Sequence, residues 1–260
     1  MTSLARALAR ALDPVILARD AGLAPDDWQA SALRSRHPRQ LWNVCRQAGK
    51  SSTGAVMAVH ETLFRPGSLV LLVSPSARQS GELIRKVLEM YRALDRPTGA
   101  DAETMMRLEL QNGSRVVALP GNEVSIRGFS APRLVLLDEA SRIPDELMAG
   151  ISPMLATVPD ARLVAMSTPA GKRGWWWRAW SDGGQLWERI EVPATAVPRI
   201  SPAFLESERA TMTQAQYRQE YGCSFEQTDA SVFDPQDVGA AIRDDVDPLA
   251  LPSLAAWRSA

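Results

Sequence analysis

The sequence predicts an α/β protein with a mostly parallel central sheet flanked by helices. Residues 69–73 (Leu-Val-Leu-Leu-Val) and 134–137 (Leu-Val-Leu-Leu) are short, wholly apolar runs. Such runs are typical of central parallel strands that are covered on both faces. Helical patterns separate them, and strands that alternate with helices indicate a parallel sheet. The chain has 260 residues, 45% of them hydrophobic and 23% charged, which is enough for one large globular domain.

The first 36 residues are predicted to form a helical lead-in. Residues 1–19 carry arginines among Ala and Leu, a pattern that indicates an amphipathic helix over about 3–12 rather than a signal peptide. A polar turn at 25–27 precedes a short helix over 28–36. Residues 41–45 are predicted to form a strand that feeds a loop.

The remaining elements continue the alternation of strands and helices. Between two apolar or alternating runs, Gln111-Asn112-Gly113-Ser114 is an Asn-Gly hairpin signal, which predicts antiparallel strands beside the parallel ones. The expected helices cover 52–64, 77–94, 145–156 and 202–221, and the expected strands cover 69–73, 105–110, 115–119, 134–137, 162–166 and 186–192. We expect one domain over 1–228, and an acidic, proline-punctuated linker or truncated domain start over 229–260.

The loop after the first strand is a variant phosphate-binding loop. Residues 44–52 read Val-Cys-Arg-Gln-Ala-Gly-Lys-Ser-Ser, which fits G-x-x-x-x-G-K-[ST] except that Val44 replaces the leading glycine. Gly49 would let the backbone approach phosphates, and the amides of the following helix would face them. Lys50 would reach the β- and γ-phosphates, and the Ser51 hydroxyl would hold Mg²⁺. The other expected nucleotide contacts are Arg46, Gln47, Ala48 and Ser52. The alternative is a Gly-Lys-Ser turn at an ordinary helix start.

The strand at 134–137 ends in two carboxylates. Ligands of parallel sheets bind at the carboxyl ends of the strands, so Asp138 is predicted to lie beside the loop and hold Mg²⁺. Glu139 would polarise the attacking water. The alternative is a helix cap after a core strand. The two motifs in this order predict a P-loop nucleoside triphosphatase of the RecA-like (ASCE) type that uses ATP.

Charge and cysteine content limit the remaining classes of protein. The formal net charge of −1 provides no global positive field, so any DNA contact requires a local patch. Cys45 and Cys223 are far apart in sequence and form neither a metal-binding pattern nor a disulfide framework, which suits a reducing cytoplasm. No apolar run is long enough to span a membrane.

Five motifs resemble those of large terminase subunits, the DNA-packaging motors of tailed bacteriophages. Arg46–Ser51 resembles their phosphate loop, in which the first glycine is often absent and an arginine is typical. Trp28-Gln29 is similar to their adenine-reading glutamine element. Ser125–Gly128 resembles their arginine-glycine segment, and Ser167-Thr168-Pro169 their coupling motif. Tyr217–Phe225 is similar to the signature that closes their ATPase domain.

The resemblance covers about residues 28–233, and each motif also has a simpler interpretation. Gln29 could be an exposed helix residue, and Arg127 could pair with Glu123. Ser167-Thr168-Pro169 could simply end a strand. The aromatic run at 175–180 could stack on DNA, but we favour a helix that packs its aromatic face.

The resemblance implies the ATPase motor domain of a large terminase, which drives double-stranded DNA into a procapsid. Lys50 and Glu139 would be catalytic, Arg46 would sense the γ-phosphate, and Thr168 would couple hydrolysis to movement. A neighbouring subunit's arginine would complete the site in a ring, with Arg127 as the candidate and Arg142 and Arg133 as alternatives. The implied partners are DNA, the portal of the procapsid, the small terminase subunit and further copies of the chain, in the cytoplasm of the bacterial host.

Two further expectations concern what the chain lacks. Large terminases carry a second, nuclease domain with clustered carboxylates, whereas Asp244, Asp245 and Asp247 have no core strand around them, so we expect no nuclease activity. A superfamily-2 helicase or translocase fragment would require a second RecA-like domain. A nucleotide-binding assembly module would not need Glu139.

Overall fold

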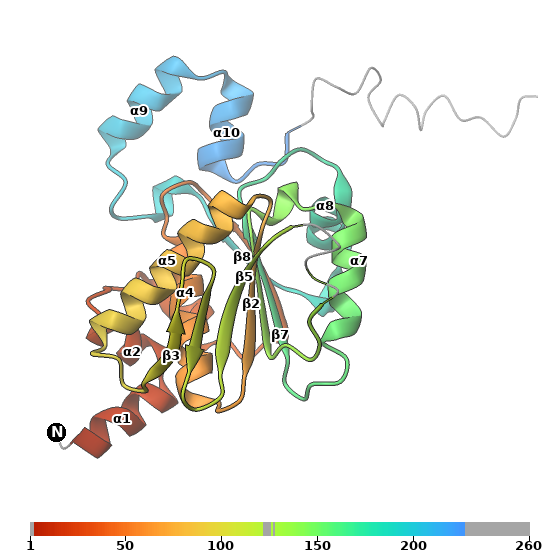
Figure 1. Ribbon diagram of the computed structural model, residues 1–260. Coiled ribbons are helices and arrows are strands. Elements are labelled where there is room, and N and C mark those ends of the chain that lie inside the picture. Colours follow the sequence, from red (N-terminus) through yellow and green to blue (C-terminus); the bar gives the residue numbers. More distant parts are fainter. Residues whose placement is uncertain (1–2, 122–125, 127, 227–260) are drawn as a thin grey trace, which may run out of the picture. The chain divides into compact units, whose positions relative to one another are not determined.

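The computed structural model describes residues 3–121, 126 and 128–226. An eight-stranded sheet lies between helices on both faces (Figure 1), in the order β3-β4-β5-β2-β6-β7-β1-β8. The predicted α/β class is therefore confirmed. The strands are β1 (Arg39–Val44), β2 (Leu69–Ser74), β3 (Ala100–Glu103), β4 (Arg107–Leu110), β5 (Arg115–Pro120), β6 (Leu134–Asp138), β7 (Arg162–Ser167) and β8 (Glu188–Val192).

The helices fall into two groups along the chain. Those before the hairpin are α1 (Ser3–Leu12), α2 (Pro14–Asp20), α3 (Asp27–Arg34), α4 (Lys50–Phe64) and α5 (Ala77–Ala93). Those after it are α7 (Asp145–Met154), α8 (Gly174–Ser181), α9 (Pro202–Thr211) and α10 (Gln214–Gly222), with single 3-10 turns at Ala140–Arg142, Gly184–Leu186 and Ala194–Ala196. Among the described residues, no helix is long and apolar enough to cross a membrane.

The apolar strands serve both faces of the sheet. On β2, Val70 and Leu72 join the hydrophobic cluster that contains α2, α3, α4 and α5, while Leu71 and Val73 join the cluster that contains α7 and α8. The same alternation holds on β6 and β7. Strands buried on both faces need apolar side chains at every position, which explains the unbroken apolar runs in the sequence.

The order of the strands positions the loop. β7 pairs in parallel with both β1 and β6 and therefore separates the strand that feeds the loop from the strand that carries the carboxylates. On the other side, β4 and β5 pair antiparallel across the predicted hairpin, where Leu110 N donates to Ser114 O over 2.8 Å. The short strand β3, which extends this edge, was not predicted because Ala100–Glu103 is polar and half-buried.

The helix predicted over about 3–12 matches α1, and in two helical patterns a capping residue begins a new helix. The amphipathic stretch over 1–19 divides at Asp13, whose side chain accepts from Val15 N at the start of α2, with Pro14 in the first turn. The helical stretch over 202–221 divides at Thr213, which forms a capping box with Gln216 at the start of α10. Capping side chains satisfy the free amides of a helix start, so they favour a break even within a helical pattern. The segment 229–260 lies outside the described residues.

Candidate active site

The loop between β1 and α4 contains two left-handed backbone positions. Gln47 has φ 60° and Gly49 has φ 91°. A Cβ atom added to Gly49 would lie 2.7 Å from Gln29 Nε2, so neither the backbone conformation nor the space tolerates a side chain. The glycine therefore lets the loop curl tightly before α4 begins at Lys50.

Lys50 lies beneath this loop. Its side chain is buried, and Nζ donates to Val44 O over 3.2 Å and to Cys45 O over 3.3 Å. These two carbonyls hold the ammonium group at the start of α4, where the helix amides also point. A positive charge and unpaired amides at one point make a site for an anion.

One side-chain hydrogen bond joins α4, the helix that follows the loop, to the end of β6. Ser51 Oγ donates to Asp138 Oδ2 over 3.0 Å, and Glu139 N donates to Asp138 Oδ1 over 3.0 Å. A hydroxyl and a carboxylate oxygen side by side are the hard ligands that Mg²⁺ takes in phosphate sites, with waters and phosphates completing its shell. Within the described part of the chain, no group of three or more His, Cys, Asp or Glu forms a metal cluster. The residues fit a magnesium ion that is shared with a phosphate.

Burial sets the electrostatics of the two carboxylates. It raises the pKa of Asp138, and the nearby Lys50 and Ser51 oppose the shift only in part. It also raises the pKa of Glu139, and the charge of Asp138 adds to this rise. Glu139 has φ 50° and is only half-buried, so the bend after β6 turns its side chain toward the loop cleft. The two carboxylates thus outnumber the buried Lys50, although Arg46, Lys86, Arg142 and Arg199 also line the cleft.

Gln29 reaches the loop from α3. It is 1% exposed, so the simpler interpretation of Gln29 as an exposed helix residue is wrong. Its Nε2 donates to Thr53 Oγ1 over 2.8 Å, and its Oε1 accepts from Asp26 N over 2.9 Å. Gln29 and Thr53, 24 positions apart, thus form one wall of the loop together.

Two arginines connect the loop to other parts of the chain. Arg46 Nε donates to Glu220 Oε2 over 2.6 Å, and Arg46 N donates to Glu220 O over 3.2 Å, so the loop is attached to α10. Arg199 Nη2 donates to Ala48 O over 3.1 Å, while Nη1 pairs with Asp26 at 2.6 Å. Arg199 was missed because no local pattern marks it. It follows a 3-10 turn and reaches the loop only through the fold.

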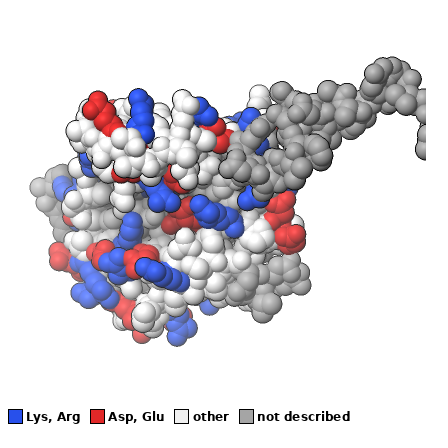
Figure 2. All heavy atoms as spheres, turned by 90° about the horizontal axis from the view of Figure 1, so that it is seen from above, with Lys and Arg blue, Asp and Glu red and all other residues white. Residues whose placement is uncertain are grey.

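These groups surround a cleft of about 960 Å³. Most of the predicted nucleotide-contacting and catalytic residues line it: Gln29, Arg46, Gln47, Gly49, Lys50, Ser51, Ser52 and Glu139. Gln79 and Lys86 of α5 and Arg199 also line it, although none of them was predicted. Seen from the side of α9 and α10, acidic and basic side chains are interspersed rather than forming a field of one sign (Figure 2).

Other predicted residues lie elsewhere. Thr168 is 3% exposed and is not among the described residues that line the cleft, and the neighbouring Ser167 Oγ lies 2.7 Å from Ser141 Oγ. Arg127, the candidate for a neighbour's arginine, lies outside the described residues. Of its two alternatives, Arg142 lines its own subunit's cleft, and Arg133 pairs with Glu61 at the opposite edge of the sheet.

The aromatic run forms helix α8. Trp175 and Trp176 are buried in the cluster beneath α7. Trp177 and Trp180 are half-buried, with ring centroids 4.8 Å and 6.0 Å from that of Phe225. This placement agrees with the packing interpretation, because rings that are engaged with one another leave no open platform for bases.

No family model matches the chain. It is 27% identical over 253 aligned residues to the large terminase subunit of Thermus virus P23-45, an alignment that covers 84% of this chain and 52% of that protein. The ATPase domain of the large terminase of Thermus phage P74-26 superposes with a TM-score of 0.71 at 22% identity, covering 80% of this chain and 97% of that one. The chain has the fold of a large-terminase ATPase domain.

The resemblance to large terminases is thereby confirmed. The large terminase of HK97 superposes less closely, with a TM-score of 0.63 at 14% identity over 79% of this chain and 51% of that one. The chain spans about half the length of the curated relatives that it matches.

Proposed function

We propose that this chain is the ATP-hydrolysing motor domain of a phage large terminase subunit, which drives double-stranded DNA into a procapsid. The observation that supports it most directly is the hydrogen bond of 3.0 Å between Ser51 and Asp138, which joins the phosphate loop to the carboxylate strand. Related structures of a thermophilic phage's large terminase contain ADP and ATP-γ-S, which supports a nucleotide in the same cleft here. The rival classes, a helicase fragment and an assembly module, find no comparable support.

Each residue of the cleft would have a separate role in hydrolysis. Lys50 would leave the carbonyls of Val44 and Cys45 to contact the β- and γ-phosphates. Ser51 and Asp138 would hold Mg²⁺, which neutralises charge on the phosphates. Glu139 would accept a proton from the attacking water, a role that its raised pKa favours near neutral pH. Gln29 would read the base, for which its amide would have to leave Thr53 and Asp26 N.

Arg46 would report the state of the nucleotide to α10. In the structure it pairs with Glu220, and a γ-phosphate would compete for the same guanidinium group. Thr168 would couple hydrolysis to movement, through the end of β7. The remaining partners that this function implies are the portal, the small subunit and neighbouring copies in a ring, all in the host cytoplasm.

Steady-state hydrolysis of ATP by the purified chain with Mg²⁺ tests the proposal. Lys50→Ala should lower the rate by roughly 10²–10³, because a positioned cation stabilises charge that develops on the phosphates. Lys172→Ala is the matched control, since Lys172 is exposed and does not line the cleft. Normal turnover by Lys50→Ala would refute the site.

A second experiment tests the shared site in a ring. Arg127→Ala should leave nucleotide binding by the isolated subunit unchanged and remove the hydrolysis that assembly stimulates. Mixing it with Lys50→Ala subunits should restore part of the activity, because each variant supplies the half that the other lacks. If wild-type subunits are stimulated on assembly and the mixture is not, Arg127 does not act on a neighbour.

A further inference from the structure

A second polar pocket lies at the amino ends of the parallel strands, whereas the cleft lies at their carboxyl ends. It has a volume of about 510 Å³ and is lined by residues before or at the start of β1, β6 and β7, by Glu61 near the end of α4, and by Arg65, which follows α4. Four of its lining residues are arginines, Arg36, Arg65, Arg133 and Arg162, and two are acids, Glu61 and Asp160. The lining therefore has a formal charge of +2, on a chain whose net charge is −1.

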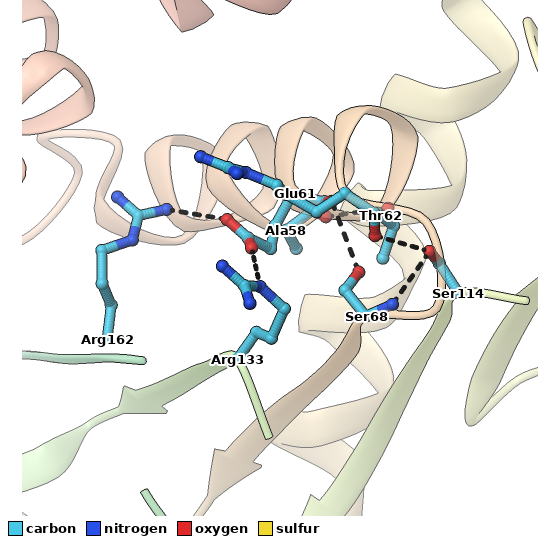
Figure 3. Close-up of polar contacts among 8 residues, drawn as sticks. Ala58, Glu61, Thr62, Ser68, Ser114, Arg133 and Arg162 are labelled. Carbon is cyan, nitrogen blue, oxygen red and sulfur yellow. Dashed lines mark hydrogen bonds and ion pairs between the residues drawn. The ribbon is translucent and has the colours of Figure 1, made fainter. Parts of the chain in front are cut away.

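One buried carboxylate forms ion pairs with two of these arginines. Glu61 accepts from Arg133 Nε over 3.0 Å through Oε1 and from Arg162 Nη2 over 3.3 Å through Oε2 (Figure 3). The Glu61 and Arg162 side chains are each 10% exposed. Because a single negative charge faces two guanidinium groups, the buried centre retains an excess positive charge.

The other two arginines increase that excess. Arg36 and Arg65 are exposed, and neither guanidinium group has a hydrogen-bond or ion-pair partner among residues 3–121, 126 and 128–226. Burial lowers the pKa of Arg162, and the charges of Arg36 and Arg65 lower it further against the opposing effect of Glu61. A purely structural role explains Arg133 and Arg162, which satisfy Glu61, but not the two free arginines on the rim.

We infer that this pocket binds phosphate groups of the DNA backbone. Guanidinium groups donate to phosphate oxygens in a fixed fork, and Arg36 and Arg65 have all their donors free for this. Backbone contacts supply affinity without reading sequence, which suits a protein that moves along DNA. The inference rests on the proposed function for the source of the phosphate. An acidic segment of a neighbouring protein and free phosphate are the competing occupants.

The pocket and the cleft lie at the two ends of one helix. α4 begins at Lys50 and carries Glu61 in its last turns, and a helix of 15 residues is about 22 Å long. A phosphodiester bound near the last turn of α4 would therefore contact the surroundings of the same helix whose first turn carries Lys50 and Ser51.

Binding of a labelled random-sequence duplex to the full chain, measured by fluorescence anisotropy at several salt concentrations, tests the inference. The double variant Arg36→Gln/Arg65→Gln should bind roughly tenfold more weakly at low salt, and the slope of log affinity against log salt should fall by about 1.8, since each phosphate contributes about 0.9. Asp160→Asn should bind more tightly, because it removes an exposed negative charge from the rim.

Arg19→Gln/Arg107→Gln is the matched control, since both residues are exposed and line neither the pocket nor the cleft. Equal affinities and slopes for the two double variants would overturn the inference. So would competition by millimolar inorganic phosphate with no binding of DNA, which would make the pocket a small-anion site. A change in self-association without a change in DNA binding would assign the pocket to a protein partner instead.

The outcome is independent of hydrolysis. The Arg36→Gln/Arg65→Gln variant should keep the DNA-free ATPase rate of the wild type, and Lys50→Ala should keep its DNA affinity. If the wild type hydrolyses no ATP, the proposed function fails while the binding result still stands. If the Arg36→Gln/Arg65→Gln variant binds DNA as tightly as the wild type does, and the wild type hydrolyses ATP, only the inference fails.

Discussion

The most buried charges are paired differently at the two ends of the parallel strands, the carboxyl edge that holds the cleft and the amino edge that holds the second pocket. At the carboxyl edge, the buried Lys50 faces two carboxylates, Asp138 and Glu139, whose pKa values are raised. At the amino edge, the buried Glu61 faces two arginines, with two more on the rim. At the carboxyl edge, the two carboxylates outnumber the buried Lys50, although exposed or half-buried basic side chains (Arg46, Lys86, Arg142 and Arg199) also line the cleft. At the amino edge, arginines outnumber acids both in the buried centre and on the rim. A nearly neutral chain can therefore hold two strongly charged sites.

The largest expected effect belongs to the carboxyl edge. Glu139→Gln should retain ATP binding and lose roughly 10²–10⁴ in turnover, because the amide keeps the shape of the side chain but cannot accept the proton of water. Single-turnover hydrolysis and equilibrium binding of a fluorescent ATP analogue measure the two properties separately. Loss of binding together with turnover would mean that Glu139 holds the metal ion or the structure, and its role would then have to be exchanged with that of Asp138.

The second-largest effect is expected on stability, when a substitution removes the buried carboxylate of the amino edge. Glu61→Ala should lower the free energy of unfolding by about 3–5 kcal/mol, because it leaves the buried Arg162 without a carboxylate. Urea denaturation measures this. Glu82→Ala is the control: its pair with Arg85 is 58% and 59% exposed, and such pairs contribute about 0–1 kcal/mol.

The same variant sharpens the comparison through its response to anions. Inorganic phosphate should raise the melting temperature of Glu61→Ala more than that of the wild type, since the anion can replace the missing carboxylate. Equal shifts in the two proteins would mean that the excess positive charge does not attract anions.

The two sites differ in how far the sequence reveals them. The carboxyl edge is built from short runs of neighbouring residues, so Lys50, Ser51, Asp138 and Glu139 could be found from loop spacing and an apolar strand. The amino edge collects Arg36, Glu61, Arg65, Arg133 and Arg162 from four separate segments. Only the strand order brings them together, and no local pattern marks any of them.

The fold shows the same division. The apolar runs predicted β2, β6 and β7 to within a residue or two, because strands buried on both faces have no other pattern. Sequence periodicity did not reveal the break at Thr213 or the short edge strand β3. The first depends on a capping box, and the second on pairing with β4.

The smallest expected effect concerns Asp138 and pH. Since burial raises the pKa of Asp138, the folded protein binds a proton that the unfolded chain has released above about pH 4. This contribution therefore reduces stability as the pH rises. Asp138→Asn remains neutral, so its melting temperature in EDTA should rise relative to that of the wild type as the pH increases above the ordinary carboxyl range. The loss of hydrogen bonds to Ser51 or Glu139 lowers the melting temperature of the variant by an amount that does not vary with pH. The test is therefore how the difference in melting temperature between variant and wild type changes with pH.

Asp145→Asn provides a control of opposite sign. The hydrogen bond from Arg178 lowers the pKa of Asp145, so its ionised form stabilises the folded state above the ordinary carboxyl range, and that contribution is lost as the pH falls. The Asp145→Asn variant should therefore approach the wild type at low pH and fall behind it as the pH rises. Mg²⁺ should stabilise the wild type more than Asp138→Asn and leave the effect of Asp145→Asn unchanged. If Asp138→Asn and Asp145→Asn follow the same pH dependence, burial does not raise the pKa of Asp138, and the contrast between the buried groups of the two edges fails.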